Sequence, residues 1–197
     1  MSGDSDLFAH RLDVLLDRLR TSYDGVGHSS GRPYVYYIYP PESERAVGRL
    51  VEDTLLSDDR LCFHHIDLLP LTIAAINGQE DKRRDLLLTP AATSAAGDIL
   101  RLWTRRLLKA VEGALVAPVT SGKPVVVLRG LAALHPLSNP TTMMEGIAEH
   151  EPRDPATNRI VPIVLLVPGT RPAQTSRTYR FLNLESHTLD FYRGEEI

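Results

Sequence analysis

The sequence predicts an α/β domain whose mostly parallel, twisted sheet carries helices on both faces. Three apolar runs of strand length are the main evidence, at residues 34–39, 125–128 and 160–167. Unbroken runs of this kind predict strands that are buried on both faces. Segments with helical periodicity alternate with them, which is typical of a parallel sheet covered by helices. The pattern leaves open a degenerate relative of the nucleotide-binding sheet.

Size and composition set the first limits. A chain of 197 residues fits one domain and can bury about 70% of its unfolded surface. We divide it into an N-terminal helix and loop that pack on the core, residues 1–32, and an α/β domain, residues 33–197. The net charge of −3 gives no overall attraction to nucleic acid, so we do not expect direct nucleic-acid binding.

The compartment follows from cysteine usage and from the apolar runs. Cys62 is the single cysteine and lies in an apolar setting, which favours a reducing compartment and a thiol that acts as a small hydrophobe. No apolar run is long enough to span a bilayer, and the acidic, polar start is unlike a signal peptide. We therefore expect a cytoplasmic protein without a membrane partner.

The first half of the chain alternates helix and strand. Residues 6–20 predict a helix that buries Leu7 among other apolar residues, and residues 21–33 predict a loop. After the strand at 34–39, a helix begins near Pro40-Pro41 and turns Ala46 and its apolar neighbours inward. A strand at 61–67 then leads to a short helix that Asp67 caps and Asn77-Gly78 closes.

The second half continues the alternation. An insertion of uncertain structure occupies residues 79–95, and a long helix covers about 97–115. After the strand at 125–128 we expect a short helix at 141–149 and a charged loop at 150–159. The strand at 160–167 is ended by Pro168-Gly169-Thr170, and two weaker strands follow near 178–184 and 188–193.

A nucleotide site is the first function that this architecture suggests, and the sequence lacks the loop for it. A phosphate-binding loop needs glycines that turn backbone N–H groups inward and a lysine that reaches the phosphates. The one Gly-Lys pair, Gly122-Lys123, precedes a strand instead of following one. The strand at 34–39 runs into Pro40, Pro41 and Glu42, and the strand that would end in a magnesium-binding acid ends at Arg129. We predict no nucleotide hydrolysis.

Metal-binding and nucleophilic patterns are also missing from the sequence. His64 and His65 are neighbours on a predicted strand, so they point to opposite faces and cannot share a metal. The other histidines are scattered without metal-ligand spacing. No Gly-x-Ser-x-Gly motif marks a serine nucleophile. We expect no cofactor, no metal and no enzymatic activity.

The ends of the buried strands are the predicted functional edge, because parallel strands gather their carboxyl ends on one side of the sheet. The edge would bind a protein partner or form a pocket for a small ligand, and an ordinary solvent-boundary arginine is the alternative interpretation of Arg129. The candidate residues are Tyr39, Pro40, Pro41, Glu42, Arg129, His135, Pro168, Gly169, Thr170 and Arg171. A second candidate interface is the face of the long helix that carries Arg101, Arg105 and Lys109.

The order of short motifs along residues 33–193 carries one further inference. The motifs are, in chain order, Tyr39-Pro40-Pro41, His135-Pro136-Leu137, Met143-Met144, the strand VPIVLLVPGT at 161–170, and Phe191-Tyr192-Arg193. In this order and spacing they resemble the BrxB-like proteins of BREX bacteriophage-exclusion systems. The chain departs from the family pattern at Ser138-Asn139-Pro140, where an arginine is usual, and in the polar stretch 171–176, where the family is often glycine-rich.

The resemblance implies a non-catalytic component of a multi-protein antiphage defence system. Such systems combine it with a methyltransferase, a large ATPase and a PglZ-type protein that resembles alkaline phosphatases. Its function would then be docking, with the PglZ-like protein as the first candidate partner among the BREX components. A small-molecule or nucleotide sensor without hydrolysis is the alternative. A flat apolar patch would favour docking, and a deep polar pocket would favour a ligand.

Overall fold

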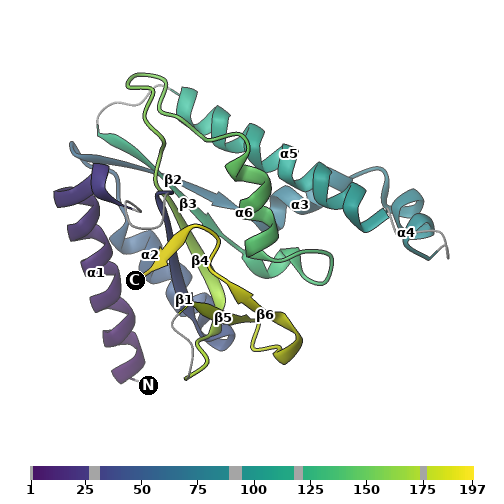
Figure 1. The fold of residues 1–197 in the computed structure, drawn as a ribbon, viewed down its shortest axis with the longest axis horizontal. Coiled ribbons are helices and arrows are strands. Elements are labelled where there is room, and N and C mark those ends of the chain that lie inside the picture. The colour runs from purple at the N-terminus through teal and green to yellow at the C-terminus, as the bar shows by residue number, and fades with distance from the viewer. Residues whose placement is uncertain (1, 27–31, 89–94, 118–121, 174–176) are drawn as a thin grey trace.

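The computed structural model describes residues 2–26, 32–88, 95–117, 122–173 and 177–197, which form a seven-stranded sheet with helices on both faces (Figure 1). The main strand order is β2-β3-β4-β1-β7, and every neighbouring pair in it is parallel. The strands are β1 (Tyr34–Tyr39), β2 (Leu61–Asp67), β3 (Lys123–Arg129), β4 (Ile163–Thr170), β5 (Thr178–Phe181), β6 (Thr188–Asp190) and β7 (Gly194–Glu196). The predicted α/β fold is confirmed.

The helices leave the sheet in the predicted alternation, and short 3₁₀ turns join several of them to the strands. The α-helices are α1 (Ser2–Ser22), α2 (Glu44–Thr54), α3 (Leu68–Ile76), α4 (Glu80–Leu88), α5 (Ala95–Val116) and α6 (Pro140–Ala148). The 3₁₀ turns are η1 (Tyr23–Gly25), η2 (Pro41–Ser43), η4 (Leu131–Leu134) and η5 (Glu185–His187).

The alternation of side chains along β1 builds two cores. Tyr34, Tyr36 and Ile38 pack into the core formed with α3, α5 and α6, and the intervening residues pack into the core formed with α1 and α2. All six residues of β1 are buried, because β4 and β7 flank the strand and helices cover both faces. This confirms the prediction, made from the aromatic run, that residues 34–39 form a strand buried on both faces.

The helix α1 begins earlier than predicted, at Ser2, and packs against α2 and the sheet. Phe8 and the leucines that follow on the same helical face are buried. Leu7, predicted to point inward, is 55% exposed, because it lies one residue before Phe8 and therefore on the other side of the helix. Ala46 of α2 is exposed for the same reason, next to the buried Val47.

The strand β4 lies further along the chain than predicted. The sequence favoured a strand at 160–167 ended by Pro168-Gly169-Thr170, but β4 includes those three residues. They stay extended because Pro168 pairs with Tyr39 of β1, while Gly169 and Thr170 pair with β5. A side chain at Gly169 would place its Cβ 2.3 Å from the carbonyl oxygen of Arg180, so this hairpin requires glycine.

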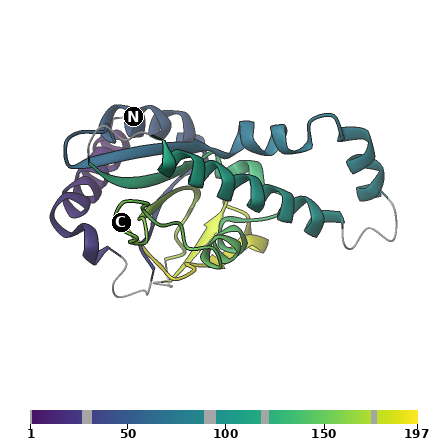
Figure 2. The same ribbon diagram turned by 90° about the horizontal axis from the view of Figure 1, so that it is seen from above.

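The predictions were incomplete at two other places. The three-residue strand β7 was not predicted, and it pairs with the first half of β1. Within the insertion at 79–95, residues 80–88 form α4, and residues 89–94 lie outside the described part of the chain. The helices α3, α4 and α5 form an arm that projects beyond the sheet, with α4 at its far end (Figures 1 and 2).

Within the described residues, no helix combines the length and the apolar composition needed to cross a membrane.

Candidate interaction site at the carboxyl edge of the sheet

The carboxyl ends of the parallel strands meet at one edge, where most of the predicted site residues lie. Asp67 of β2 pairs with Arg129 of β3, and Tyr39 of β1 pairs with Pro168 of β4. Because β3 pairs with β4, the two pairs lie side by side along the edge. Each residue of the edge has its own contacts.

The turn between β1 and α2 is filled by its own side chains. Tyr39 is 2% exposed, and its hydroxyl donates to Glu44 Oε2 at 2.7 Å. Burial, followed by the nearby Glu44 carboxylate, raises the pKa of Tyr39 far above its usual range. Pro40 and Pro41 enter the η2 turn half-buried, and Glu42 is exposed.

This turn occupies the strand–loop–helix position at which a phosphate-binding loop would lie. The prolines offer no N–H group to a phosphate. Glu44, the first residue of α2, places a carboxylate at the helix end that would otherwise attract an anion. The residues present here do not fit a bound phosphate.

The Gly122-Lys123 pair lies at the opposite edge, at the start of β3. The Lys123 Nζ atom lies 3.8 Å from Asp24 Oδ2 and 4.8 Å from the centre of the Tyr23 ring. Gly122 has a φ of +87°, and a Cβ there would come within 2.7 Å of the Leu61 backbone. Gly122 therefore lets the start of β3 lie close against the start of β2.

Arg129 is held by two carboxylates. Its Nη1 donates to Glu52 of α2, and its Nε lies 3.5 Å from Asp67 Oδ2. The guanidinium lowers the pKa of Glu52. Asp67 also accepts from the backbone N–H of Leu69 at 2.9 Å and so caps α3, as predicted. Arg129 therefore ties α2 to the strand ends at which α3 begins.

The other side of the edge holds Arg171, which follows β4. Its Nη1 lies 2.7 Å from Glu196 Oε2 of β7. Burial raises the pKa of Glu196 although Arg171 and Arg11 lie close by. Pro168 and Gly169 are buried and Thr170 is half-buried within β4, so this part of the predicted edge is strand and not loop.

His135 lies exposed beside a residue that the sequence analysis did not select. The rings of His135 and His187 meet edge to face with their centres 5.3 Å apart. The Ser186 hydroxyl lies 2.9 Å from His187 Nδ1. No spacing rule could reveal the pair, because His187 reaches His135 only through the unpredicted pairing of β5 with the end of β4.

The second predicted interface lies on α5, whose outer face exposes Arg101, Arg105 and Lys109. Arg101 is paired with Asp98 one turn earlier. The face is basic and exposed.

The histidines of β2 point in different directions, as predicted. His64 Nε2 lies 3.7 Å from Cys62 Sγ, whereas His65 Nε2 lies 3.0 Å from the carbonyl oxygen of Leu55. The sequence predicts an apolar setting for Cys62, but in the fold the thiol has an imidazole neighbour. Among the described residues, no group of three or more His, Cys, Asp or Glu side chains could hold a metal ion.

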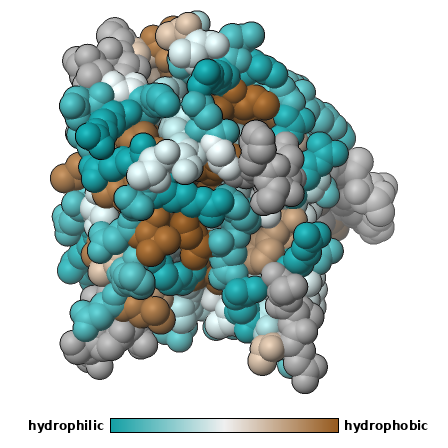
Figure 3. Space-filling view, turned by 60° about the vertical axis from the view of Figure 1, so that its left-hand side comes forward, coloured by the Kyte–Doolittle hydropathy of each residue, from teal (hydrophilic) through white to brown (hydrophobic). Residues whose placement is uncertain are grey.

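An apolar helical face lies next to the Asp67–Arg129 pair and was not predicted. The exposed residues of α3 are all apolar, and we call them the α3 stripe: Leu69, Pro70, Ile73 and Ala74. Leu69 is 53% and Ile73 is 58% exposed. A helix that is apolar all round is normally buried. On the face seen in Figure 3, by contrast, apolar side chains form separate patches among hydrophilic ones.

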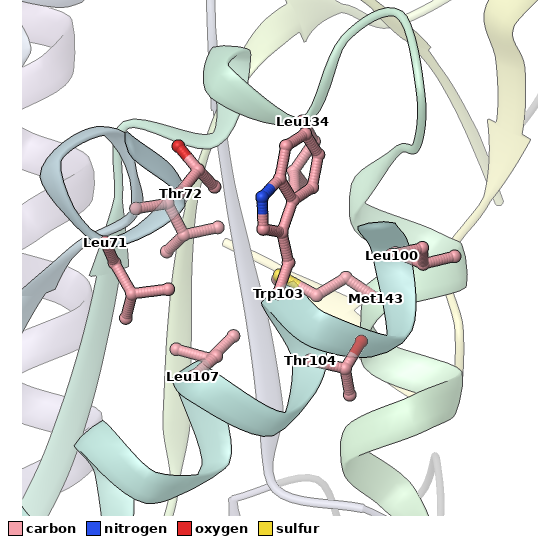
Figure 4. Close-up of a pocket in the computed structure, with 9 residues that line it drawn as sticks. Leu71, Thr72, Leu100, Trp103, Thr104, Leu107, Leu134 and Met143 are labelled. Atoms are coloured by element: carbon pink, nitrogen blue, oxygen red, sulfur yellow. The ribbon is translucent and has the colours of Figure 1, made fainter. Parts of the chain in front are cut away.

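One cavity lies beneath the helical arm, and two grooves lie at the starts of the strands. One cavity of about 10 Å³, enough for about one water molecule, lies between α3 and α5. The indole of Trp103 lines it, and the indole nitrogen is on the side of Thr72 (Figure 4). Two open grooves of about 490 and 540 Å³ share Gly122 and Lys123 at the opposite edge of the sheet. The predicted site residues line none of these three.

Comparison with known proteins found no match among family models, curated proteins or solved structures. The class that the fold defines is therefore a single α/β domain with a mostly parallel sheet and a projecting helical arm.

Proposed function

We propose that this chain is a non-catalytic interaction subunit of a BREX-type antiphage system, and that it docks onto a PglZ-like protein. The observation that carries the proposal is the α3 stripe beside the strand ends. Apolar residues exposed together on one face mark protein interaction sites more often than single exposed leucines do. The partner and the system come from the motif order that resembles BrxB-like proteins.

The position of the α3 stripe refines the predicted interface. It begins two residues after Asp67, so the stripe and the Arg129 end of the edge are continuous. Arginine at the border of an apolar patch is common in interfaces. Near the Arg171 end, Leu7 and Val14 of α1 are also exposed, but they stand seven residues apart, whereas the members of the α3 stripe adjoin one another. We therefore assign docking to the β2–β3 end of the edge.

The filled turn after β1 supports the same proposal over a nucleotide sensor. A sensor requires a concave, polar-lined site. At this edge Tyr39, Glu44 and the two prolines occupy the place that a nucleotide would need.

The test uses the tagged chain expressed from its native operon. We expect a PglZ-like protein to co-elute with the wild type, and the double variant Leu69→Gln/Ile73→Gln to lose it. Both positions are more than half exposed, so the fold should survive the change. Charge reversal of Arg129 or Arg171 is a poorer test, because each side chain holds an internal ion pair.

The matched control changes two exposed positions of α5, Arg101→Gln/Arg105→Gln. Loss of the partner in this control, with retention in the α3 variant, would move the interface to α5. Absence of any partner from the wild-type eluate would contradict the proposed function.

A further inference from the structure

Among the strands that the structure describes, β2 ends the sheet, and none of them lies beside the outer side of its backbone. Lys123 N donates to the carbonyl oxygen of Arg60 at 2.8 Å, just before the β2–β3 ladder begins. In a parallel pair, alternate residues of a strand bond to the same neighbour. The even-numbered residues of β2 therefore bond to β3, and the backbone groups of residues 61, 63, 65 and 67 point outward.

The first half of this outer edge is covered by the segment before β2. Asp58 N donates to the carbonyl oxygen of Leu61, and Asp58 Oδ1 accepts from Leu61 N, both at 2.8 Å. Ser57 Oγ accepts from Phe63 N, also at 2.8 Å. These bonds are the protection that edge strands commonly carry.

The second half of the edge is open. Within the described chain, no hydrogen bond engages the carbonyl oxygen of Phe63, either backbone group of His65, or Asp67 N. The imidazole of His65 is bonded to Leu55 O and so lies against one face of the sheet. His65 and Asp67 are half-buried, as edge residues are.

We propose that the partner adds a short extended segment to β2 along residues 63–67, so that the sheet continues into the partner. This inference rests on the proposed function and specifies its contact. The chemistry is that of a peptide backbone: a carbonyl group accepts from His65 N, and N–H groups donate to the carbonyl oxygens of Phe63 and His65. Such strand addition takes its affinity from main-chain hydrogen bonds.

The covered half of the edge favours a partner segment over a second copy of this chain. Twofold pairing of two β2 strands about His65 would bring the start of α3 of one copy, at Leu69, to the place opposite Leu61 of the other. That place is already held by Asp58, which bonds to both backbone groups of Leu61. A segment that turns away at Phe63 meets no such obstruction.

The test compares two substitutions at one position, His65→Pro and His65→Ala. Proline removes the outward N–H and is tolerated on an edge strand, because that N–H takes no part in the ladder with β3. Alanine removes the same imidazole and keeps the N–H. We expect the co-purifying partner to bind His65→Ala as it binds the wild type, and His65→Pro at least about tenfold more weakly.

Hydrogen exchange of the wild type provides a second measurement that needs no variant. Exchange at the His65 amide should slow when the purified partner is added. Equal binding of both variants, or equal loss in both, together with unchanged exchange, would overturn strand addition and leave the docking proposal standing. If His65→Pro does not fold, the exchange result decides alone. If no partner co-elutes with the wild type, the proposed function fails and this inference fails with it.

Discussion

Beside β1 the chain goes on covering the strand backbone beyond the end of β7, whereas beside β2 the cover stops halfway. The strand β7 pairs only with residues 34–36 of β1. Beyond it, Ile197 N donates to the carbonyl oxygen of Tyr36 at 3.2 Å, and Arg11 Nη1 donates to that of Ile38 at 2.7 Å. The Arg11 guanidinium also lies 4.4 Å from the centre of the Tyr37 ring.

At the β2 edge the preceding segment also covers the strand backbone, but only as far as Phe63. Ser57 and Asp58 satisfy the backbone as far as Phe63 N, and His65 has no equivalent of Arg11 among the described residues. The chain therefore supplies donors to the β1 backbone beyond β7 and leaves part of β2 available. That difference suggests that the open part is an interaction site, because an unused open edge invites aggregation.

The largest effect should come from the centre of the sheet, which both edges depend on. Val126 is 0% exposed in β3, so Val126→Asp would bury an unpaired carboxylate, and Val164→Asp in β4 would do the same. The expected cost is roughly several kcal/mol, enough to unfold a domain of ordinary stability. Circular dichroism against temperature checks this.

The matched control for this change is Val116→Asp, at a position that is 73% exposed at the end of α5. It should lower stability by no more than about 1 kcal/mol, the scale of a carboxylate at the carboxyl end of a helix. A folded Val126→Asp protein with an unchanged melting temperature would contradict the sheet order.

The central strands were predictable because burial on both faces leaves a signal in the sequence itself. The run at 34–39 needs no knowledge of its neighbours, since every residue in it is apolar or aromatic. The end of β4 was not predictable in this way. Proline and glycine normally end a strand, and only the distant pairing of Pro168 with Tyr39 and of Gly169 with Phe181 keeps these two residues extended.

The candidate site was predictable only in part. The rule that strand ends gather at one edge located Arg129 correctly, but its carboxylate partners come from α2 and β2. The α3 stripe was missed because an apolar helix resembles a buried helix in the sequence. Whether its outer face is covered depends on the packing of the whole arm. The open edge of β2 depends on strand order, which no single segment determines.

Beside β1 and β7, removing the Arg11 side chain should lower the free energy of unfolding by less than burying a charge does, but by an amount that is easy to measure. Arg11→Met keeps the aliphatic stem and leaves the carbonyl oxygen of Ile38 without its donor. Hydrogen bonds from charged donors contribute about 1.5–3 kcal/mol, and we expect a loss of about 2 kcal/mol in urea denaturation. Arg49→Met, at an exposed position of α2, is the control and should change little. Equal effects of the two would show that Arg11 does not protect the edge.

The stabilisation that Asp58 gives to the covered half of the β2 edge should depend on pH. Backbone N–H groups of Leu61 and Arg60, and then Arg20, lower the pKa of Asp58 from 3.8 to about 2. Because the folded-state pKa is the lower one, the stabilisation is complete above about pH 4 and is lost as the pH falls toward 2. The difference in denaturation midpoint between wild type and Asp58→Asn should therefore shrink over that range. A difference that is constant from neutral pH to about pH 2 would argue against this account.

The smallest change in stability is expected at the α3 stripe. A small change is what the docking proposal requires, because a docking surface is unpacked in the free chain. Leu69 and Ile73 are more than half exposed, so Leu69→Gln/Ile73→Gln removes little buried apolar surface. Glutamine has a helix propensity close to that of leucine and better than that of isoleucine. The unfolding free energy should change by no more than about 1 kcal/mol, which is about 0.5 kcal/mol at each position. Leu12→Ala in α1, at a position that is 0% exposed, should lose about 2–5 kcal/mol under the same conditions. A loss above about 1 kcal/mol in the α3 variant would mean that the stripe is packed in the free chain, and a packed stripe could not be the docking surface.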